Sequence, residues 1–291
     1  MIDPKTNPLI GVPDLAALGT SERVTILDCS WYLPQEVRDP LVEYELGHIP
    51  GARFFDWESC SGGDSTEACL YLPTGNRFAA HAAALGIREG DLVVAYDHEG
   101  FHAIAARAWW MFRVFGHERV VVLEGGLKAW KQAGLLTEGG VPPAPAPAER
   151  RGAEFDSRLV RTFDDLRANI EAGAEQVVDV RSRERYLGAG NGPDKRPGHI
   201  PGAVSLPFAE CLEKGANVFR PLGELAEKGK GAGIDPDKPL VAYCGGGGSS
   251  PVVALGYYLL GKRDVAIYDG AWHDWCRHGE APIERGAPES P

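Results

Sequence analysis

The chain has 291 residues, of which 44% are apolar, so it is long enough for one large or two ordinary domains with buried cores. Its formal net charge of −11 at pH 7 repels nucleic acid and anionic membrane surfaces, and we expect neither as a partner. The six cysteines form no Cys-x-x-Cys pair and no zinc spacing with histidine, so no metal site is expected.

The N-terminus carries no sign of a targeting segment. It lacks a basic start and an apolar core of signal-peptide length, and no stretch of the chain approaches the ~20 apolar residues of a membrane span. We therefore expect a cytoplasmic protein with reduced thiols.

The chain contains one internal repeat. His48-Ile49-Pro50-Gly51-Ala52 recurs 151 residues later as His199-Ile200-Pro201-Gly202-Ala203, and Ile26-Leu27-Asp28 is matched by Val177-Val178-Asp179 at the same shift. Further matches follow at slightly smaller shifts, up to Trp130 and Trp275. Two copies of one unit therefore account for most of the chain.

A proline-rich stretch separates the two copies. Residues 139–147 contain four prolines, which favour an extended backbone and cannot donate to helix or sheet hydrogen bonds. We predict a first domain over 1–140, a linker over 141–155 and a second domain over 156–291.

Each copy alternates short β-branched runs with amphipathic helices, the pattern of a parallel α/β sheet flanked by helices on both faces. Strands are predicted at 120–123 and 240–243. Helices are predicted over 104–115 and 251–260, ending at Gly116 and Gly261 respectively.

A glycine loop follows the strand 240–243 and begins with Cys244. Four glycines, Gly245, Gly246, Gly247 and Gly248, lead to Ser249; we predict Ser250 as the cap of the next helix, with Pro251 at its first position. Ligands of open parallel sheets bind at such strand ends. Consecutive glycine N–H groups can turn inward, and the helix N-terminus adds roughly half a positive charge.

This cradle favours a thiolate or a bound anion, so Cys244 is predicted to be a nucleophile. The alternative is a small buried apolar residue before a turn, the usual role of a lone cysteine. Four successive glycines are costly in backbone entropy and contribute nothing to packing, which favours the nucleophile.

The first copy differs at the corresponding loop. It has Asp97, His98 and Glu99 after Tyr96, where the second copy has the cysteine and glycines after Tyr243. An acidic loop repels anions, so one copy is expected to be catalytic and the other a structural partner.

The chain resembles the rhodanese family, in particular its tandem-domain thiosulfate and 3-mercaptopyruvate sulfurtransferases. The resemblance rests on the cysteine loop, on residues 109–117, 185–188 and 267–272, and on the two His-Ile-Pro-Gly motifs. It implies two rhodanese-like domains, an inactive first and a catalytic second. It also implies that Cys244 cycles through a persulfide without a metal or organic cofactor.

Donors of this family are small anions, and the acceptor is a thiol or cyanide. Arg185 matches the family's substrate-binding arginine, and Arg196 or the adjacent Lys195 is the candidate for a second cation. The loop residues 245–249 complete the predicted substrate-binding set. At the shift of 151, Arg185, Lys195 and Arg196 fall on Pro34, Tyr44 and Glu45, so cations are expected only in the second copy.

The loop matches neither branch of the family fully. Thiosulfate-type loops carry a basic side chain where Gly246 stands, and mercaptopyruvate-type loops carry a serine there. That serine works with an aspartate and a histidine from the first domain, whose matching positions are Glu58 and Leu70. The uncharged loop favours the monoanionic donor, 3-mercaptopyruvate, over thiosulfate.

Two other functions remain as alternatives. A cysteine phosphatase or arsenate reductase needs a Cys-x5-Arg loop, but position 250 is Ser250. A non-catalytic persulfide carrier, which delivers sulfur to a partner protein, is distinguished from an enzyme by its lack of turnover.

Overall fold

The computed structural model describes residues 3–19, 23–33, 36–62, 71–99, 103–149, 152–189, 196–215 and 217–286. These residues form two compact units. The first contains the described residues of 1–63, 72–156 and 215–218, and the second contains those of 64–71, 157–214 and 219–291. The stretch predicted to be a linker is counted with the first unit, where the N–H of Ala148 donates to the carbonyl of Ala83 at 2.9 Å.

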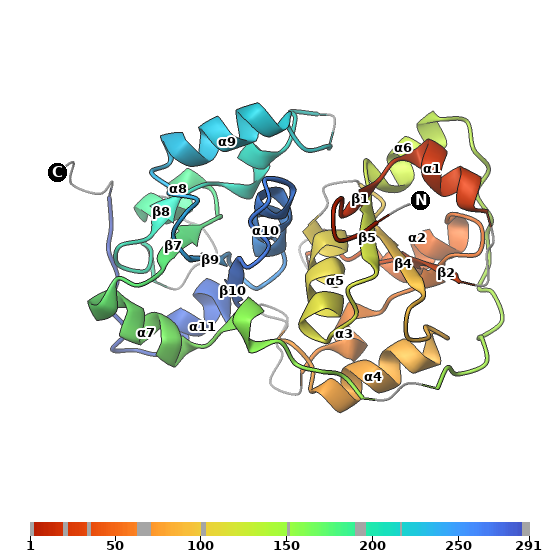
Figure 1. Cartoon of the computed structure of the whole chain (residues 1–291), viewed down its shortest axis with the longest axis horizontal. Coiled ribbons are helices and arrows are strands. Elements are labelled where there is room, and N and C mark those ends of the chain that lie inside the picture. The colour runs from red at the N-terminus through yellow and green to blue at the C-terminus, as the bar shows by residue number, and fades with distance from the viewer. Residues whose placement is uncertain are drawn as a thin grey trace. The chain divides into compact units, whose positions relative to one another are not determined.

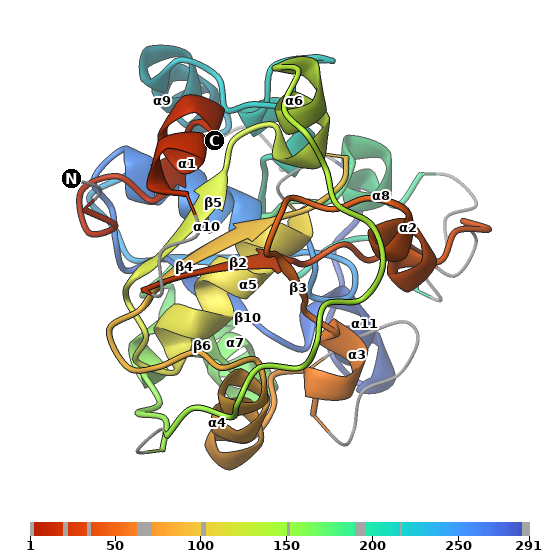
Figure 2. The ribbon, with the colours of Figure 1, turned by 90° about the vertical axis from the view of Figure 1, so that its right-hand side faces the viewer.

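The first unit is built on a parallel sheet of five described strands (Figures 1 and 2). In chain order the strands are β1 (Leu9–Ile10), β2 (Val24–Asp28), β3 (Arg53–Phe54), β4 (Leu92–Tyr96) and β5 (Val120–Leu123), and their spatial order is β1-β5-β4-β2-β3. Its helices are α1 (Val12–Leu18), α2 (Pro40–Leu46), α3 (Trp57–Cys60), α4 (Gly75–Ala84), α5 (Ala103–Val114) and α6 (Gly126–Gln132).

The second unit repeats this arrangement strand for strand. Its strands are β6 (Val160–Arg161), β7 (Gln176–Asp179), β8 (Val204–Ser205), β9 (Leu240–Tyr243) and β10 (Ala266–Tyr268), in the parallel order β6-β10-β9-β7-β8. Its helices are α7 (Phe163–Ala172), α8 (Arg183–Leu187), α9 (Leu222–Gly231), α10 (Ser250–Leu259) and α11 (Ala271–Arg277), with short 3-10 turns η1 (Ser157–Leu159) and η2 (Phe208–Cys211).

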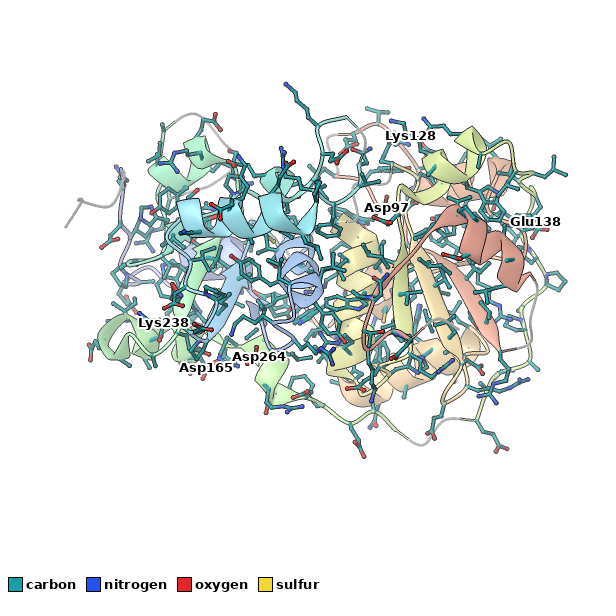
Figure 3. The ribbon with its side chains drawn as sticks, turned by 45° about the horizontal axis from the view of Figure 1, so that its top comes forward. Asp97, Lys128, Glu138, Asp165, Lys238 and Asp264 are labelled. Atoms are coloured by element: carbon teal, nitrogen blue, oxygen red, sulfur yellow. The ribbon has the colours of Figure 1, made fainter. Side chains whose placement is uncertain are left out.

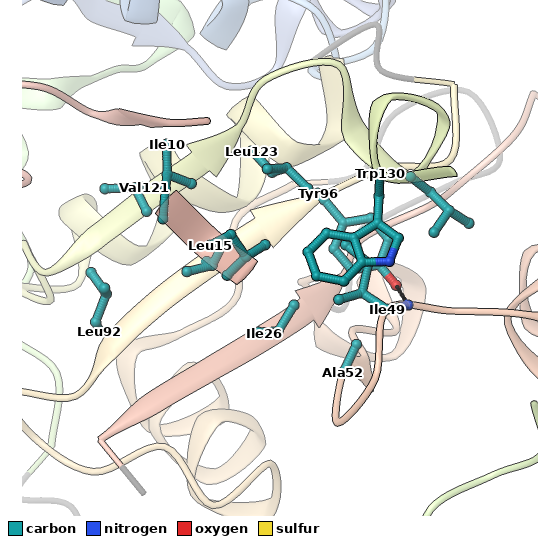
Figure 4. Close-up of a cluster of buried hydrophobic side chains, with 12 residues drawn as sticks. Ile10, Leu15, Ile26, Ile49, Ala52, Leu92, Tyr96, Val121, Leu123 and Trp130 are labelled. Carbon is teal, nitrogen blue, oxygen red and sulfur yellow. Dashed lines mark hydrogen bonds between the residues drawn. The ribbon is translucent and has the colours of Figure 1, made fainter. Parts of the chain in front are cut away.

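Both faces of each sheet are covered, so the central strands are apolar throughout. All five residues of β4 and all four residues of β9 are buried. In the first unit, α1 and α6 pack on one face through Leu15 and Trp130 (Figure 4), and α5 packs on the other. In the second unit, α7 and α11 occupy the position of α1 and α6, and α10 that of α5.

The predicted elements are confirmed within one residue at their ends. The strands 120–123 and 240–243 are β5 and β9, and the predicted helices are α5 and α10. Gly116 and Gly261 have φ of 78° and 94°, in the left-handed region that favours glycine after a helix. The described residues include no helix long and apolar enough to cross a membrane.

Candidate active site

Cys244 follows β9, the central strand of the second sheet, at its carboxyl end. The first turn of α11 donates two backbone hydrogen bonds to the start of the loop. The N–H of Trp272 donates to the carbonyl of Cys244, and the N–H of His273 donates to that of Gly245, both at 2.9 Å. These bonds direct the first two carbonyl oxygens of the loop towards α11.

Two donors converge on the Cys244 sulfur. The N–H of Gly247 lies 3.1 Å from Sγ, and the hydroxyl of Ser250 lies 3.7 Å from it. Gly247 has a φ of 94°, which a residue with a Cβ rarely adopts, so this turn of the loop depends on glycine. The Cys244 side chain is buried, with 1% of the residue exposed, and a donor must enter the loop to reach the sulfur.

The predicted cap of α10 is wrong by one residue. Ser249 holds the N-cap position without a side-chain cap bond, Ser250 is the first helical residue, and Pro251 is the second. The Ser250 hydroxyl is therefore directed to the sulfur and not to the helix N-terminus. Gly246, Gly248 and Ser249 are half-buried in the remainder of the loop.

Arg185 lies directly against the loop. It belongs to the last turn of α8, and its guanidinium packs so closely on Gly245 that a Cβ added to this glycine would lie 2.9 Å from Nη2. The absence of a side chain at position 245 thus admits the cation. The predicted association of Arg185 with the glycine loop is present in the geometry.

Arg196 is engaged elsewhere. Its Nη1 and Nη2 donate to the carbonyls of His278 and Ala281 at 2.9 and 2.8 Å, and its own carbonyl accepts from Trp272 Nε1. It lines a surface pocket with Pro282 and Arg285, and no residue of the glycine loop lines that pocket. These contacts favour a structural role for Arg196, while Lys195 lies outside the described residues.

A buried ion pair that contacts Tyr243, the residue before Cys244, was not predicted from the sequence. Arg181 donates from Nε and Nη2 to Asp179 at 2.6 to 3.1 Å, and its guanidinium lies 4.3 Å from the ring centroid of Trp272. The hydroxyl of Tyr243 also donates to Asp179, at 2.6 Å. Burial, followed by the charge of Asp179, raises the pKa of Tyr243 well above its usual value, so this phenol stays protonated. The repeated aspartate at positions 28 and 179 was the available signal.

Burial raises the pKa of three other cysteine thiols. Desolvation raises the pKa of Cys60 and of Cys211 to about 12, and it raises the pKa of Cys29 well above the ordinary value. Such thiols carry almost no thiolate at neutral pH, so they are poor nucleophiles. The described residues offer no cluster of three or more potential metal ligands among His, Cys, Asp and Glu.

The structure describes one of the two positions, Glu58 and Leu70, that match the aspartate and histidine of the family's first domain. Glu58 accepts a hydrogen bond from Trp31 Nε1 at 2.9 Å, in the first unit. Leu70 lies outside the described residues.

The two units share a turn that reveals their true correspondence. Tyr44 donates to the carbonyl of Ala52 and stacks on His48, and Tyr186 donates to Ala203 and stacks on His199. Each histidine also contacts the carbonyl of its tyrosine through Nδ1 at 2.8 Å, so both histidines stabilise this turn.

Because Tyr44 matches Tyr186, the counterpart of Arg185 is Glu43. The predicted counterpart, Pro34, which lies outside the described residues, is therefore wrong, and Glu45 matches Leu187 instead of Arg196. The tyrosine precedes its histidine by four residues in the first unit and by thirteen in the second, and the constant shift of 151 concealed this difference. The two units differ in charge at this position, as expected, because the first unit has the carboxylate of Glu43 where the second has the guanidinium of Arg185.

The first unit fills its loop with a charged network. Asp97, which is labelled in Figure 3, matches Cys244, because its carbonyl accepts from the N–H of Leu127 as that of Cys244 accepts from the N–H of Trp272. His98, in place of Gly245, contacts Asp28 through Nε2 at 2.8 Å and Glu43 through Nδ1 at 3.3 Å. A hydrogen bond from Arg38 is the main cause that lowers the pKa of Glu43 to about 2. Glu43 is therefore charged at neutral pH.

Known proteins share this architecture and sequence. The family model of the rhodanese-like domain matches residues 13–133 and 162–278. The chain is 42% identical to the human 3-mercaptopyruvate sulfurtransferase, over 90% of this chain and 88% of the relative. It is 39% identical to the mitochondrial thiosulfate/3-mercaptopyruvate sulfurtransferase 1 of Arabidopsis thaliana, over 96% of this chain and 78% of the relative.

A solved structure agrees at the level of the fold. The crystal structure of the 3-mercaptopyruvate sulfotransferase SseA of Escherichia coli superimposes with a TM-score of 0.83 at 34% identity. The match covers 92% of this chain and 99% of that chain.

Proposed function

Since the chain belongs to the rhodanese family, with two rhodanese-like domains, we propose that it is a sulfurtransferase whose second domain carries sulfur as a persulfide on Cys244. One observation carries this assignment to a residue. The Cys244 sulfur receives the N–H of Gly247 and the hydroxyl of Ser250, in a loop against which the Arg185 guanidinium packs.

The two half-reactions follow from this arrangement. The Cys244 thiolate attacks the sulfur of 3-mercaptopyruvate, an S–S bond forms, the C–S bond breaks, and pyruvate leaves as its enolate and takes up a proton. With thiosulfate the S–S bond of the donor breaks and sulfite leaves. Cyanide or a thiolate then attacks the outer sulfur, and the electron pair returns to Cys244 Sγ. Backbone N–H groups of the loop stabilise the charge on sulfur in each state.

The charge around the loop favours 3-mercaptopyruvate as the donor. The Arg185 guanidinium packs on Gly245, Arg196 donates to the carbonyls of His278 and Ala281, and residues 245–249 carry no charged side chain. A loop without the family's basic side chain suits a monoanion better than a dianion. The relatives named above include an enzyme named for both donors, so both donors are tested here.

Turnover tests this proposal. Purified protein is incubated with 3-mercaptopyruvate or thiosulfate plus cyanide, and thiocyanate is measured over time. We expect many turnovers per chain and a larger kcat/KM for 3-mercaptopyruvate than for thiosulfate. Cys244→Ser should produce no thiocyanate with either donor. A sulfur adduct that forms once per chain without thiocyanate production identifies a persulfide carrier instead.

A further inference from the structure

Ser250 is buried at the start of α10, behind the glycine loop. It is 0% exposed, and Ser249 precedes it at the N-cap position without a side-chain cap bond. A serine at the N-cap position usually accepts a hydrogen bond from a free N–H of the first helical turn. Here the hydroxyl of Ser250 lies 3.7 Å from Sγ of Cys244, within hydrogen-bond range for sulfur.

The chemistry of the two groups sets the direction of this bond. A thiolate can only accept hydrogen bonds, whereas a serine hydroxyl can donate one. The second donor on the same sulfur, the N–H of Gly247, is fixed by the backbone. Both donors act in a buried place, where a hydrogen bond to a charged group is stronger than in water.

We propose that Ser250 is a further catalytic residue, whose hydroxyl donates to Cys244 Sγ whenever this sulfur carries charge. The inference rests on the proposed function for its role in turnover. Sγ is charged before it attacks the donor and again when it leaves the persulfide, so the same hydroxyl serves both half-reactions. Ser250 acts on the sulfur and leaves donor binding to other groups.

The test compares Ser250→Ala with a matched loss of a buried serine hydroxyl. Ser61→Ala is the control, because Ser61 is 1% exposed and its hydroxyl donates to the carbonyl of Trp57, in the first unit. Ser250→Thr retains a hydroxyl. Two readouts are taken for each variant: the rate of Cys244 alkylation by iodoacetamide, corrected with Cys244→Ser, and the kcat and KM with 3-mercaptopyruvate and cyanide.

We expect Ser250→Ala to slow alkylation and to lower kcat by about tenfold each, as for the loss of one hydrogen bond to a charged group, with the donor KM unchanged. Ser61→Ala keeps the wild-type values, and Ser250→Thr, if it retains a cooperative thermal transition, recovers most of the loss. Wild-type alkylation and kcat in Ser250→Ala overturn the proposal, as does an equal loss in Ser61→Ala.

The alkylation arm separates this inference from the proposed function. Iodoacetamide needs no sulfur donor, so it measures the effect of Ser250 on Cys244 even if the wild type makes no thiocyanate. In that event the proposed function fails, while the comparison of alkylation rates still decides the role of Ser250.

Discussion

At the scale of single residues, two neighbouring positions distinguish the loops of the two domains. The second domain has Arg185 against Gly245, whose missing side chain leaves room for the guanidinium. The first domain has Glu43 against His98, with the imidazole in the space that the glycine leaves open. The same contact therefore places a cation beside one loop and fills the other with an imidazole.

Substitutions at this contact test the role of Arg185 in donor binding. Arg185→Ala removes a charge partner, and we expect the donor KM to rise roughly 10- to 100-fold with a modest effect on the thermal midpoint. Gly245→Ala is expected to raise KM as well, because the added methyl displaces a flexible guanidinium and not the backbone.

Arg183→Ala provides the matched control. Arg183 belongs to the same helix, α8, and is exposed. Its loss should leave KM near the wild-type value. Steady-state kinetics with 3-mercaptopyruvate give all three values, and an unchanged KM in Arg185→Ala removes this residue from the site.

At the scale of elements, the segment that joins β2 to the His48 turn has the same length as the segment that joins β7 to the His199 turn, but its helix lies at a different position. Nineteen residues lie between Asp28 and His48, and nineteen lie between Asp179 and His199. Within this span, Tyr44 of α2 precedes its histidine by four residues, whereas Tyr186 of α8 precedes its histidine by thirteen, which is nine residues more. The helix packs in the same way in both units, because the tyrosine, the carbonyl that accepts its hydrogen bond and the stacked imidazole are the same.

The network that fills the first loop makes the stability of that domain depend on pH. Burial alone lowers the pKa of His98, but hydrogen bonds and charges from Asp28 and Glu43 outweigh it, and the net pKa is raised above the ordinary 6.5. The imidazolium therefore stabilises the folded domain fully below about pH 6.5, and this contribution is lost as the pH rises through the folded pKa.

We expect the stability difference between wild type and His98→Gln to be largest at about pH 5.5 and to shrink towards about pH 8.5. Urea unfolding gives the overall free energy, and hydrogen exchange of β2 and β4 amides reports the first domain. A difference that grows as the pH rises contradicts the assignment of a charged His98.

At the scale of the whole molecule, one fold is used twice with different electrostatics. Residues 1–156 hold 13 basic and 22 acidic residues, whereas residues 157–291 hold 17 and 19. The field of the first domain thus opposes small anions more strongly than that of the second. This asymmetry supports the proposal that sulfur transfer takes place in the second domain.

Persulfide stoichiometry tests this division. We expect one sulfane sulfur per wild-type chain after reaction with the donor, and none in Cys244→Ser. The double variant Cys244→Ser with Asp97→Cys should also acquire none, because His98 and Glu43 occupy the positions of Gly245 and Arg185. Intact-protein mass spectrometry measures each case, and a sulfur adduct on the double variant shows that the first loop needs only a thiol.

The sequence by itself determined the duplication, the parallel α/β architecture and the ends of the main strands and helices, and it predicted Cys244 as the nucleophile. These properties follow from local patterns: apolar runs, glycines after helices, and a cysteine followed by four glycines. Only the tertiary structure decided which charged side chains meet the loop. Arg185 packs on Gly245, Arg196 donates to two distant carbonyls, and Ser250 faces the sulfur, because chain folding and not sequence spacing sets these contacts.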